Sequence, residues 1–235
     1  MRAWLRKKIN PVVPVHIFVP AALCVLVNCL AYYGTRALMQ GARHYNLTTA
    51  VDRFIPFHPG WVLIYLGSFV FWIVGYLVIA KQGKEHWYRF VLTDIMAKLL
   101  CGVCFLVIPT TNVRPEITGD GAMERLMAAI YAVDAPTELF PSIHCLESWL
   151  CYIGVRGQKK VPEWYRSFAC VFAVMVFAST QFTKQHYLVD IAGALLLAEG
   201  CYYLAQRTNW YRPVMRVCER ITACLFGSEE EQHAE

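Results

Sequence analysis

A histidine and an aspartate four residues apart, His186 and Asp190, are the residues of this sequence best arranged for chemistry. On a helix, this spacing places both side chains on one face. The carboxylate can then accept a hydrogen bond from one ring nitrogen and leave the other nitrogen available as a nucleophile, as in hydrolytic triads. A structural pair at a helix end has the same spacing, so the prediction needs support from other groups.

Two further segments carry groups that suit a phosphate. Ser142 follows a proline and precedes an apolar run, which predicts a helix N-cap, and the free N–H groups at a helix start attract an anion. His144 lies in the first turn of the same helix and can face the same anion. Arg114 carries planar donors that match two phosphate oxygens. Each of the three also has an ordinary interpretation, as a helix cap, an interfacial histidine or a headgroup anchor.

Six apolar runs must position these residues. Hydrophobic residues make up 57% of the 235-residue chain and charged residues 17%, a balance typical of a protein folded in a bilayer. The runs suit a hydrocarbon core about 30 Å thick. The sequence therefore predicts an all-α, polytopic six-transmembrane-helix bundle, a single membrane domain over residues 1–235 with a catalytic core of about 50–206 and short tails at both ends. The expected helices lie near 14–34, 60–80, 88–108, 142–156, 166–182 and 186–206.

Lysine and arginine are distributed unequally between the two ends of these helices. Fifteen fall on one side and six on the other, and Lys98 lies inside the third span. The positive-inside rule then predicts that both termini are cytoplasmic. The three segments come from different connections, yet their Arg, His and Asp residues all fall on the opposite, extracytoplasmic or lumenal side. The charge count was made without reference to the spacing of the motifs, so this agreement independently favours one shared site.

In this order on six helices, the segments resemble the type 2 phosphatidic acid phosphatase superfamily of lipid phosphate phosphatases and phosphotransferases, over roughly residues 50 to 200. The matching elements are Arg114-Pro115, Pro141-Ser-Ile-His144 and His186-Tyr-Leu-Val-Asp190. The resemblance implies that His186 attacks phosphorus to form a phosphohistidine, that Asp190 orients it, and that His144 protonates the leaving alcohol. It also implies that Arg114 and Ser142 hold the phosphate oxygens.

Three positions depart from the family pattern, and two of them remove a cation. Val107 stands seven residues before Arg114, where the phosphatases carry a lysine, and Ser179-Thr180 stands where they carry Ser-Arg. Ile143 replaces the glycine between Ser and His. Lys184, two residues from the nucleophile, is a candidate replacement for one of the missing phosphate ligands. The residues that make up the second and third elements resemble most the branch of the family that includes inositol phosphorylceramide synthases.

These observations leave two enzymatic reactions open. The first, and preferred, is hydrolysis of a lipid phosphate or diphosphate whose headgroup enters from the outer leaflet. The second is transfer of a phospho-headgroup to an alcohol, as in inositol phosphorylceramide or sphingomyelin synthases. His and Arg side chains would supply the positive charge, so neither a metal nor a cofactor is expected. The sequence names neither the lipid nor an oligomeric state.

Other classes of protein fit less well. A transporter would need charges within its spans, and Asp94 and Lys98 have the i, i+4 spacing of a structural ion pair near the cytoplasmic end of the third helix rather than of a proton path. A metalloenzyme would need a ligand motif such as His-Glu-x-x-His, which the sequence lacks. The ten cysteines fall mostly in apolar runs as packing residues. The net charge of +5 forms no basic stripe, so nucleic acid is not an expected partner.

Overall fold

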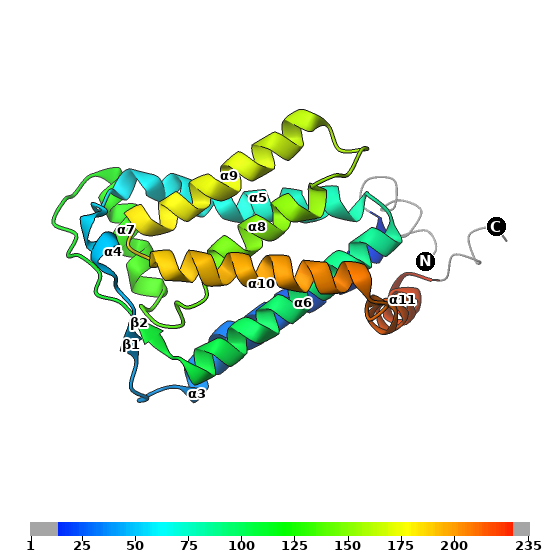
Figure 1. The fold of residues 1–235 in the computed structure, drawn as a ribbon, viewed down its shortest axis with the longest axis horizontal. Coiled ribbons are helices and arrows are strands. Elements are labelled where there is room, and N and C mark those ends of the chain that lie inside the picture. Colours follow the sequence, from blue (N-terminus) through cyan, green and yellow to red (C-terminus); the bar gives the residue numbers. More distant parts are fainter. Residues whose placement is uncertain (1–13, 228–235) are drawn as a thin grey trace.

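Long helices lying side by side form the body of the protein in the computed structural model, which describes residues 14–227 (Figure 1). Six of them are apolar, so the predicted all-α, six-helix membrane bundle is confirmed. Their ends differ from the predicted ones by at most four residues. The cations at positions 2, 6, 7 and 8, which entered the charge count, lie outside the described residues.

Five of the six helices are long and apolar enough to cross a membrane. They are Val15–Leu38, Pro59–Ala80, Lys84–Val107, Glu163–Phe182 and Leu188–Arg207. The first joins η1 (Val15–Ile17), α2 (Phe18–Cys29), η2 (Leu30–Gly34) and α3 (Thr35–Leu38), and the second joins η3 (Pro59–Trp61) and α5 (Val62–Ala80). The other three are α6 (Lys84–Val107), α9 (Glu163–Phe182) and α10 (Leu188–Arg207).

The sixth apolar helix, α8 (Ile143–Val155), is shorter than the others and packs against α5, α6, α9 and α10. Its 13 residues span about 20 Å, less than the hydrocarbon core of about 30 Å. The chain that leads into α8 is irregular, and Leu139 and Ser142 there are buried. Irregular backbone at membrane depth is stable only where protein or a polar cavity surrounds it. The start of α8 is therefore a place where the bundle encloses a non-helical segment.

Two glycines let α8 approach its neighbours closely. A Cβ atom on Gly154 would lie 2.5 Å from Ile79 Cδ1, and one on Gly75 would lie 2.7 Å from Cys151 Sγ. At either position a larger residue would force the contacted side chain, or the helix that carries it, to move. Small residues at such contacts are the usual means by which membrane helices pack, because hydrocarbon tails leave no hydrophobic force between them.

A buried ionic cluster lies in the core between α5, α6 and α8. Lys98 Nζ is 2.9 Å from Asp94 Oδ1, which confirms the predicted ion pair, and it also contacts Glu147. The Tyr76 hydroxyl oxygen lies within hydrogen-bond distance of both carboxylates, 2.9 Å from Asp94 and 2.6 Å from Glu147. The pair was expected near an end of its helix, but Asp94 lies ten residues into α6, near its middle. Glu147 was not anticipated, because an isolated acid in an apolar run does not reveal its partner.

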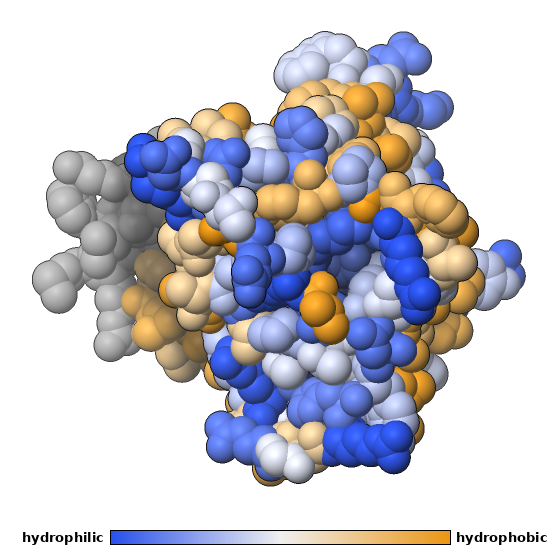
Figure 2. All heavy atoms as spheres, turned by 90° about the vertical axis from the view of Figure 1, so that its left-hand side faces the viewer, coloured by the Kyte–Doolittle hydropathy of each residue, from blue (hydrophilic) through white to orange (hydrophobic). Residues whose placement is uncertain are grey.

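Short elements gather at one end of the bundle, which we call the α7 end. They are the parallel strands β1 (Tyr45–Asn46) and β2 (Thr110–Thr111), α4 (Ala50–Phe54) and the amphipathic α7 (Ala122–Val133). Seen from this end, hydrophilic residues surround a hollow in the surface (Figure 2). In the connection between the first two spans, the polar residue Asp52 is buried.

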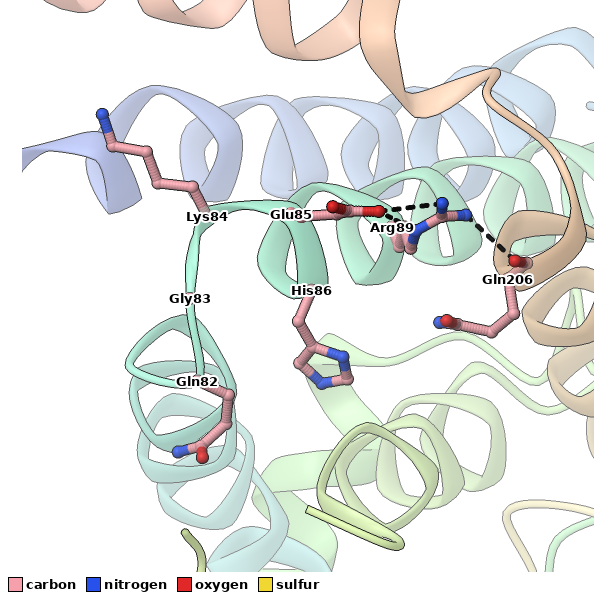
Figure 3. Close-up of a pocket in the computed structure, with 7 residues that line it drawn as sticks. All are labelled: Gln82, Gly83, Lys84, Glu85, His86, Arg89 and Gln206. Carbon is pink, nitrogen blue, oxygen red and sulfur yellow. Dashed lines mark hydrogen bonds and ion pairs between the residues drawn. The ribbon is translucent and has the colours of Figure 1, made fainter. Parts of the chain in front are cut away.

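The opposite end, which we call the α11 end, carries a helix beyond the six spans, α11 (Tyr211–Phe226). Arg89 of α6 contacts both α10 and α11 there, and Figure 3 shows its bond to Gln206. Its guanidinium donates to the carbonyls of Ala205, Gln206 and Thr208 at the end of α10, and it lies 4.4 Å from the centre of the Tyr211 ring. A cation at the last carbonyls of a helix satisfies groups that have no helical partner. Arg89 thereby fastens α11 to α6 and α10.

Candidate active site

His186 lies in the short connection between α9 and α10, at the α7 end. Its Nδ1 is 3.2 Å from Asp190 Oδ2 and 3.1 Å from the Leu139 carbonyl oxygen. Both neighbours are acceptors, so the network assigns the ring proton to Nδ1 and leaves the lone pair on Nε2. Asp190 is fully buried and His186 is 8% exposed. The predicted contact between His186 and Asp190 is therefore formed, and it leaves Nε2 as the ring nitrogen without a proton.

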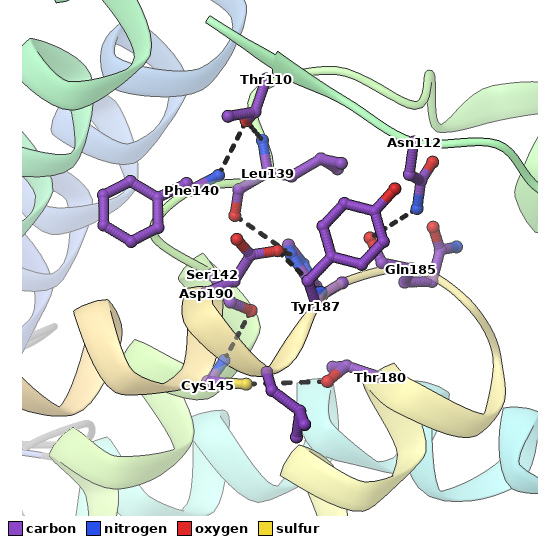
Figure 4. Close-up of polar contacts among 12 residues, drawn as sticks. Thr110, Asn112, Leu139, Phe140, Ser142, Cys145, Thr180, Gln185, Tyr187 and Asp190 are labelled. Carbon is purple, nitrogen blue, oxygen red and sulfur yellow. Dashed lines mark hydrogen bonds and ion pairs between the residues drawn. The ribbon is translucent and has the colours of Figure 1, made fainter. Parts of the chain in front are cut away.

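The pair forms in a different way from the one predicted. The sixth helix was expected to begin at 186, but α10 begins at Leu188 with Tyr187 as its N-cap. Asp190 Oδ2 accepts the Tyr187 backbone N–H at 2.9 Å, so the same oxygen caps the helix and holds the imidazole (Figure 4). His186 thus lies outside the helix, on a segment that the helix cap orients.

Helix α4 holds this segment on both sides of the nucleophile. Asp52 Oδ1 accepts the Leu188 N–H at 2.9 Å, two residues after His186. Lys184, two residues before it, donates from Nζ to the Asp52 carbonyl at 3.0 Å and to the Ile55 carbonyl. Burial works against ionisation of Asp52, but hydrogen bonds from Thr49 and Leu188 outweigh it and lower the pKa of the carboxyl. The Asp52 carboxylate is therefore a stable charged cap.

The Lys184 side chain therefore holds its loop against α4. Its backbone adopts φ of +54°, a left-handed conformation that is uncommon for residues other than glycine. Burial lowers the pKa of its ammonium, and the nearby Asp52 partly opposes that shift. Lys184 was predicted to bind a phosphate, but its ammonium would first have to leave the Asp52 and Ile55 carbonyls.

Arg114 reaches the nucleophile segment from the chain after β2. Its guanidinium donates to Gln185 Oε1, one residue before His186, and to the Asp134 carbonyl. It also lies 3.5 Å from Asp134 Oδ2 and 4.6 Å from the Tyr131 ring centre. Among the described residues, its Nε has no hydrogen-bond partner although it is buried. The Arg114 guanidinium thus contacts the residue next to His186, is partly neutralised by the Asp134 carboxylate, and keeps one N–H donor unused.

Ser142 and His144 enter from the start of α8. Ser142 Oγ accepts the Cys145 N–H at 3.2 Å, as a helix N-cap does, and Ser142 N donates to the Asp190 carbonyl at 3.2 Å. The His144 ring centre is 6.0 Å from that of His186. Its Nε2 is buried without a hydrogen-bond partner in the part of the chain that the structure describes. An unpartnered buried nitrogen in a ring close to a second histidine suits a group that exchanges a proton during a reaction.

Aromatic residues of α5 enclose the His144 ring. Tyr65 stacks on it at 4.3 Å between ring centres, and Trp72 and Phe69 lie at 5.3 and 5.8 Å. Water is excluded on this side, which strengthens the interaction of the imidazole with any charge brought beside it. The structure therefore brings Arg114, Ser142, His144, His186 and Asp190 to one place, whereas the Lys184 ammonium is directed to α4.

The two positions where the family pattern has a cation contribute none. Val107 is 70% exposed at the end of α6. The Thr180 hydroxyl donates to the Phe177 carbonyl at 2.8 Å, while its own carbonyl accepts the Gln185 and His186 N–H groups at 2.9 and 3.2 Å. Thr180 therefore shapes the nucleophile loop through its backbone.

Several residues that build the site were not predicted. Thr110 Oγ1 accepts the N–H groups of Leu139 and Phe140 at 2.9 and 3.0 Å (Figure 4). Asn112 Nδ2 donates to the Lys184 carbonyl at 2.8 Å. These bonds tie β2 to both segments of the site. Only Asp52 carried a sequence signal, because the spacing of Thr49 and Asp52 is that of a capping box. The others are single polar residues in loops.

A helical membrane bundle that presents a carboxylate-oriented histidine, a second histidine and an arginine at one end defines a class of membrane enzymes that transfer phosphoryl groups. The family model of the PAP2 superfamily matches residues 17–204, and the chain belongs to that superfamily. The branch that includes inositol phosphorylceramide synthases is not singled out by this match. Comparisons with curated proteins and with solved structures give no significant match.

Proposed function

We propose that this protein is a membrane-embedded, metal-independent phosphatase that hydrolyses a lipid phosphate or diphosphate through a phosphohistidine on His186. The observation that supports it most is the position of His186 Nδ1 between two acceptors, with the second histidine 6.0 Å away. The acceptors fix the tautomer and the ring orientation, so Nε2 points its lone pair toward a bound phosphate.

In the first step, His186 Nε2 attacks phosphorus and the bond from phosphorus to the leaving oxygen breaks. Asp190 stabilises the imidazolium character of the attacking ring, and His144 gives its proton to the leaving oxygen. The negative charge of the bound phosphate favours the protonated form of His144 beforehand. The unused Nε–H of Arg114 and the first turn of α8 at Ser142 hold the phosphate oxygens.

In the second step, water attacks the phosphohistidine, the nitrogen–phosphorus bond breaks, and His144 takes the proton of the water. Inorganic phosphate leaves and both histidines return to their starting states. Metal ions have no role in this sequence, because the protein side chains supply the positive charge. We expect turnover to continue in the presence of a chelator.

The proposed substrate approaches within the membrane. The excess of lysine and arginine at the α11 end supports cytoplasmic termini and an extracytoplasmic or lumenal site. A lipid of the outer leaflet can then bring its headgroup to His186 while its tails stay in hydrocarbon, which avoids a cost of about 0.8 kcal/mol per CH₂ extracted.

Transfer to an alcohol is a second candidate function, favoured by the charge of the site. Arg114 is paired with Asp134, Lys184 is bound to α4 carbonyls, and Thr180 stands in place of a family arginine. A phosphate monoester carries up to two negative charges, whereas a phosphodiester carries one. A site whose cations are already engaged compensates one charge more easily than two. A diester donor would leave its phospho-headgroup on His186, and a second alcohol would then take it.

One assay separates the two reactions and tests both. The purified protein is incubated with lipid monophosphates, lipid diphosphates and phosphodiesters, each with and without alcohol acceptors, and free phosphate and new phosphodiesters are measured. Phosphate release alone supports the phosphatase, and acceptor-dependent diester formation supports transfer. Turnover that persists at the wild-type rate in folded His186→Ala protein would exclude the proposed chemistry for either reaction.

A further inference from the structure

Helix α11 runs across the end of the bundle. In Figure 1 it is seen end-on beside the ends of α6 and α10, whose axes lie in the plane of the picture. It begins at Tyr211, four residues after α10 ends at Arg207. Four residues span at most about 14 Å, so α11 must lie within the headgroup layer next to the end of the span.

One face of α11 packs against the helices of the bundle. Tyr211, Cys218 and Thr222 are buried there. The Tyr88 hydroxyl donates to Glu219 Oε1 at 3.0 Å, and the Phe226 ring stacks on Phe18 at 5.9 Å between centres. These contacts to α6 and α2 fix the rotation of α11 about its own axis. The directions of its other two faces are therefore set as well.

The second face is apolar and exposed. Val217, Ile221 and Leu225 recur every four residues and are 56%, 44% and 56% exposed. They follow Trp210, also exposed, at the position where membrane proteins place aromatic residues in the interface. The end of α10 also exposes apolar residues, among them Tyr203 and Leu204.

The third face is basic. Arg212, Arg216 and Arg220 recur at the same spacing as the apolar stripe and are all exposed. With 3.6 residues per turn, the apolar stripe lies about 80° around the helix from the protein face, and the basic stripe lies about 140° from both of them. Arginines at that angle to the apolar stripe point away from hydrocarbon, and their long side chains can reach the layer where the phosphate groups of lipids lie. Anionic headgroups complement this stripe, and hydrocarbon complements its neighbour.

We propose that α11 docks on anionic phospholipids of the leaflet at the α11 end, with Val217, Ile221 and Leu225 in hydrocarbon and the three arginines bound to headgroup phosphates. Through Arg89 and Tyr211 this contact holds the ends of α6 and α10 at the membrane surface. The proposal does not depend on the reaction assigned to the other end of the bundle.

Photo-crosslinking of the full-length protein in nanodiscs tests this surface. The discs contain a phospholipid with a photoreactive acyl chain and either an anionic or a zwitterionic headgroup, and lipid adducts are mapped to peptides by mass spectrometry. We expect adducts on residues 210–226, with a preference for the anionic lipid. Arg212→Gln, Arg216→Gln and Arg220→Gln together should lower that preference about tenfold or more, since each cation near a charged surface contributes separately.

Two matched variants make the outcome decisive. Lys81→Gln, Lys159→Gln and Lys160→Gln together remove three exposed cations from loops at the same end and should leave the preference unchanged. Replacement of the three arginines by lysine should also keep it. The proposal is overturned if α11 gives no adducts while the exposed Leu196 of α10 does, or if the glutamine variant of α11 keeps its anionic preference. Equal loss in the control variant would overturn it too.

Discussion

Replacing Asp52 by asparagine tests whether α4 positions the nucleophile from outside the reaction site. One carboxylate oxygen accepts the Leu188 N–H at 2.9 Å, and the other accepts the Thr49 N–H at 2.8 Å and the Thr49 hydroxyl at 2.6 Å. An amide offers a single acceptor oxygen, so at least one side of this arrangement is lost. Loss of a helix cap costs about 0.5–2 kcal/mol of stability.

The effect on catalysis should exceed the effect on stability. Leu188 is two residues from His186, and a displacement of about 1 Å at a reacting group can lower a rate about 100-fold. We expect kcat to fall by about 10- to 100-fold in Asp52→Asn. KM should change little, because the Asp52 carboxylate bonds to the protein and not to the substrate.

The assay must separate mispositioning from loss of folded protein. Turnover is therefore expressed per site able to form the phosphoenzyme, and thermal unfolding is followed in the same preparation. Arg53→Gln, a change at the exposed neighbour on α4, serves as the control and should behave as wild type. Wild-type kcat in Asp52→Asn would refute the positioning role of α4.

The pH dependence of this contact has a definite sign. The pKa of Asp52 in the folded protein lies below the ordinary aspartate value of 3.8, so its ionised form stabilises the fold. That contribution is complete above about pH 3.8 and is lost as the pH falls through the lower, folded value. Acid unfolding should therefore start at higher pH in Asp52→Asn than in wild type. Identical acid transitions would show that the cap contributes nothing.

Three further substitutions address the buried cluster, the proton donor and the charge of the site. Lys98→Met should lower the free energy of unfolding by about 3–5 kcal/mol, because it leaves two buried carboxylates uncompensated, whereas exposed Lys81→Met should not; equal melting temperatures would contradict this. His144→Ala should slow substrates with alkoxide leaving groups about 100-fold or more and spare nitrophenyl esters, which need no protonation; a uniform loss would argue against a general acid. Asp134→Asn should release Arg114 and shift the preference between phosphate monoesters and diesters toward monoesters by about tenfold; unchanged selectivity would show that the ion pair does not set it.

The sequence predicted the parts of the fold that depend on hydropathy and local capping. Apolar runs located all six helices, and Ser142 caps α8 as its position implied. The α11 helix was missed because its arginines recur every four residues and keep its mean hydropathy low, although the same spacing makes it amphipathic. Hydropathy alone detects spans and passes over helices that lie on the surface.

The sequence indicated which residues the structure brings together at the candidate site, but it did not indicate how their side chains are arranged. The spacing of His186 and Asp190 suggested a shared helix face, but Asp190 prefers the third position of the helix, where it accepts the Tyr187 N–H. The role of Lys184 could not be read from its position two residues from the nucleophile, because its partners are α4 carbonyls more than a hundred residues away. Long-range contacts of loops leave no periodic signal in a sequence.

Trapping of the covalent intermediate tests the central claim most directly. The protein is mixed with a lipid phosphate or phosphodiester labelled at phosphorus, quenched in alkali, digested and mapped by mass spectrometry. A nitrogen–phosphorus bond is stable in base and labile in acid, so its chemistry is recognisable. We predict label on the peptide that carries His186 in wild type and in His144→Ala, and none in His186→Ala. Label on a different residue, or an active wild-type enzyme that carries no label under rapid quenching, would contradict nucleophilic attack by His186.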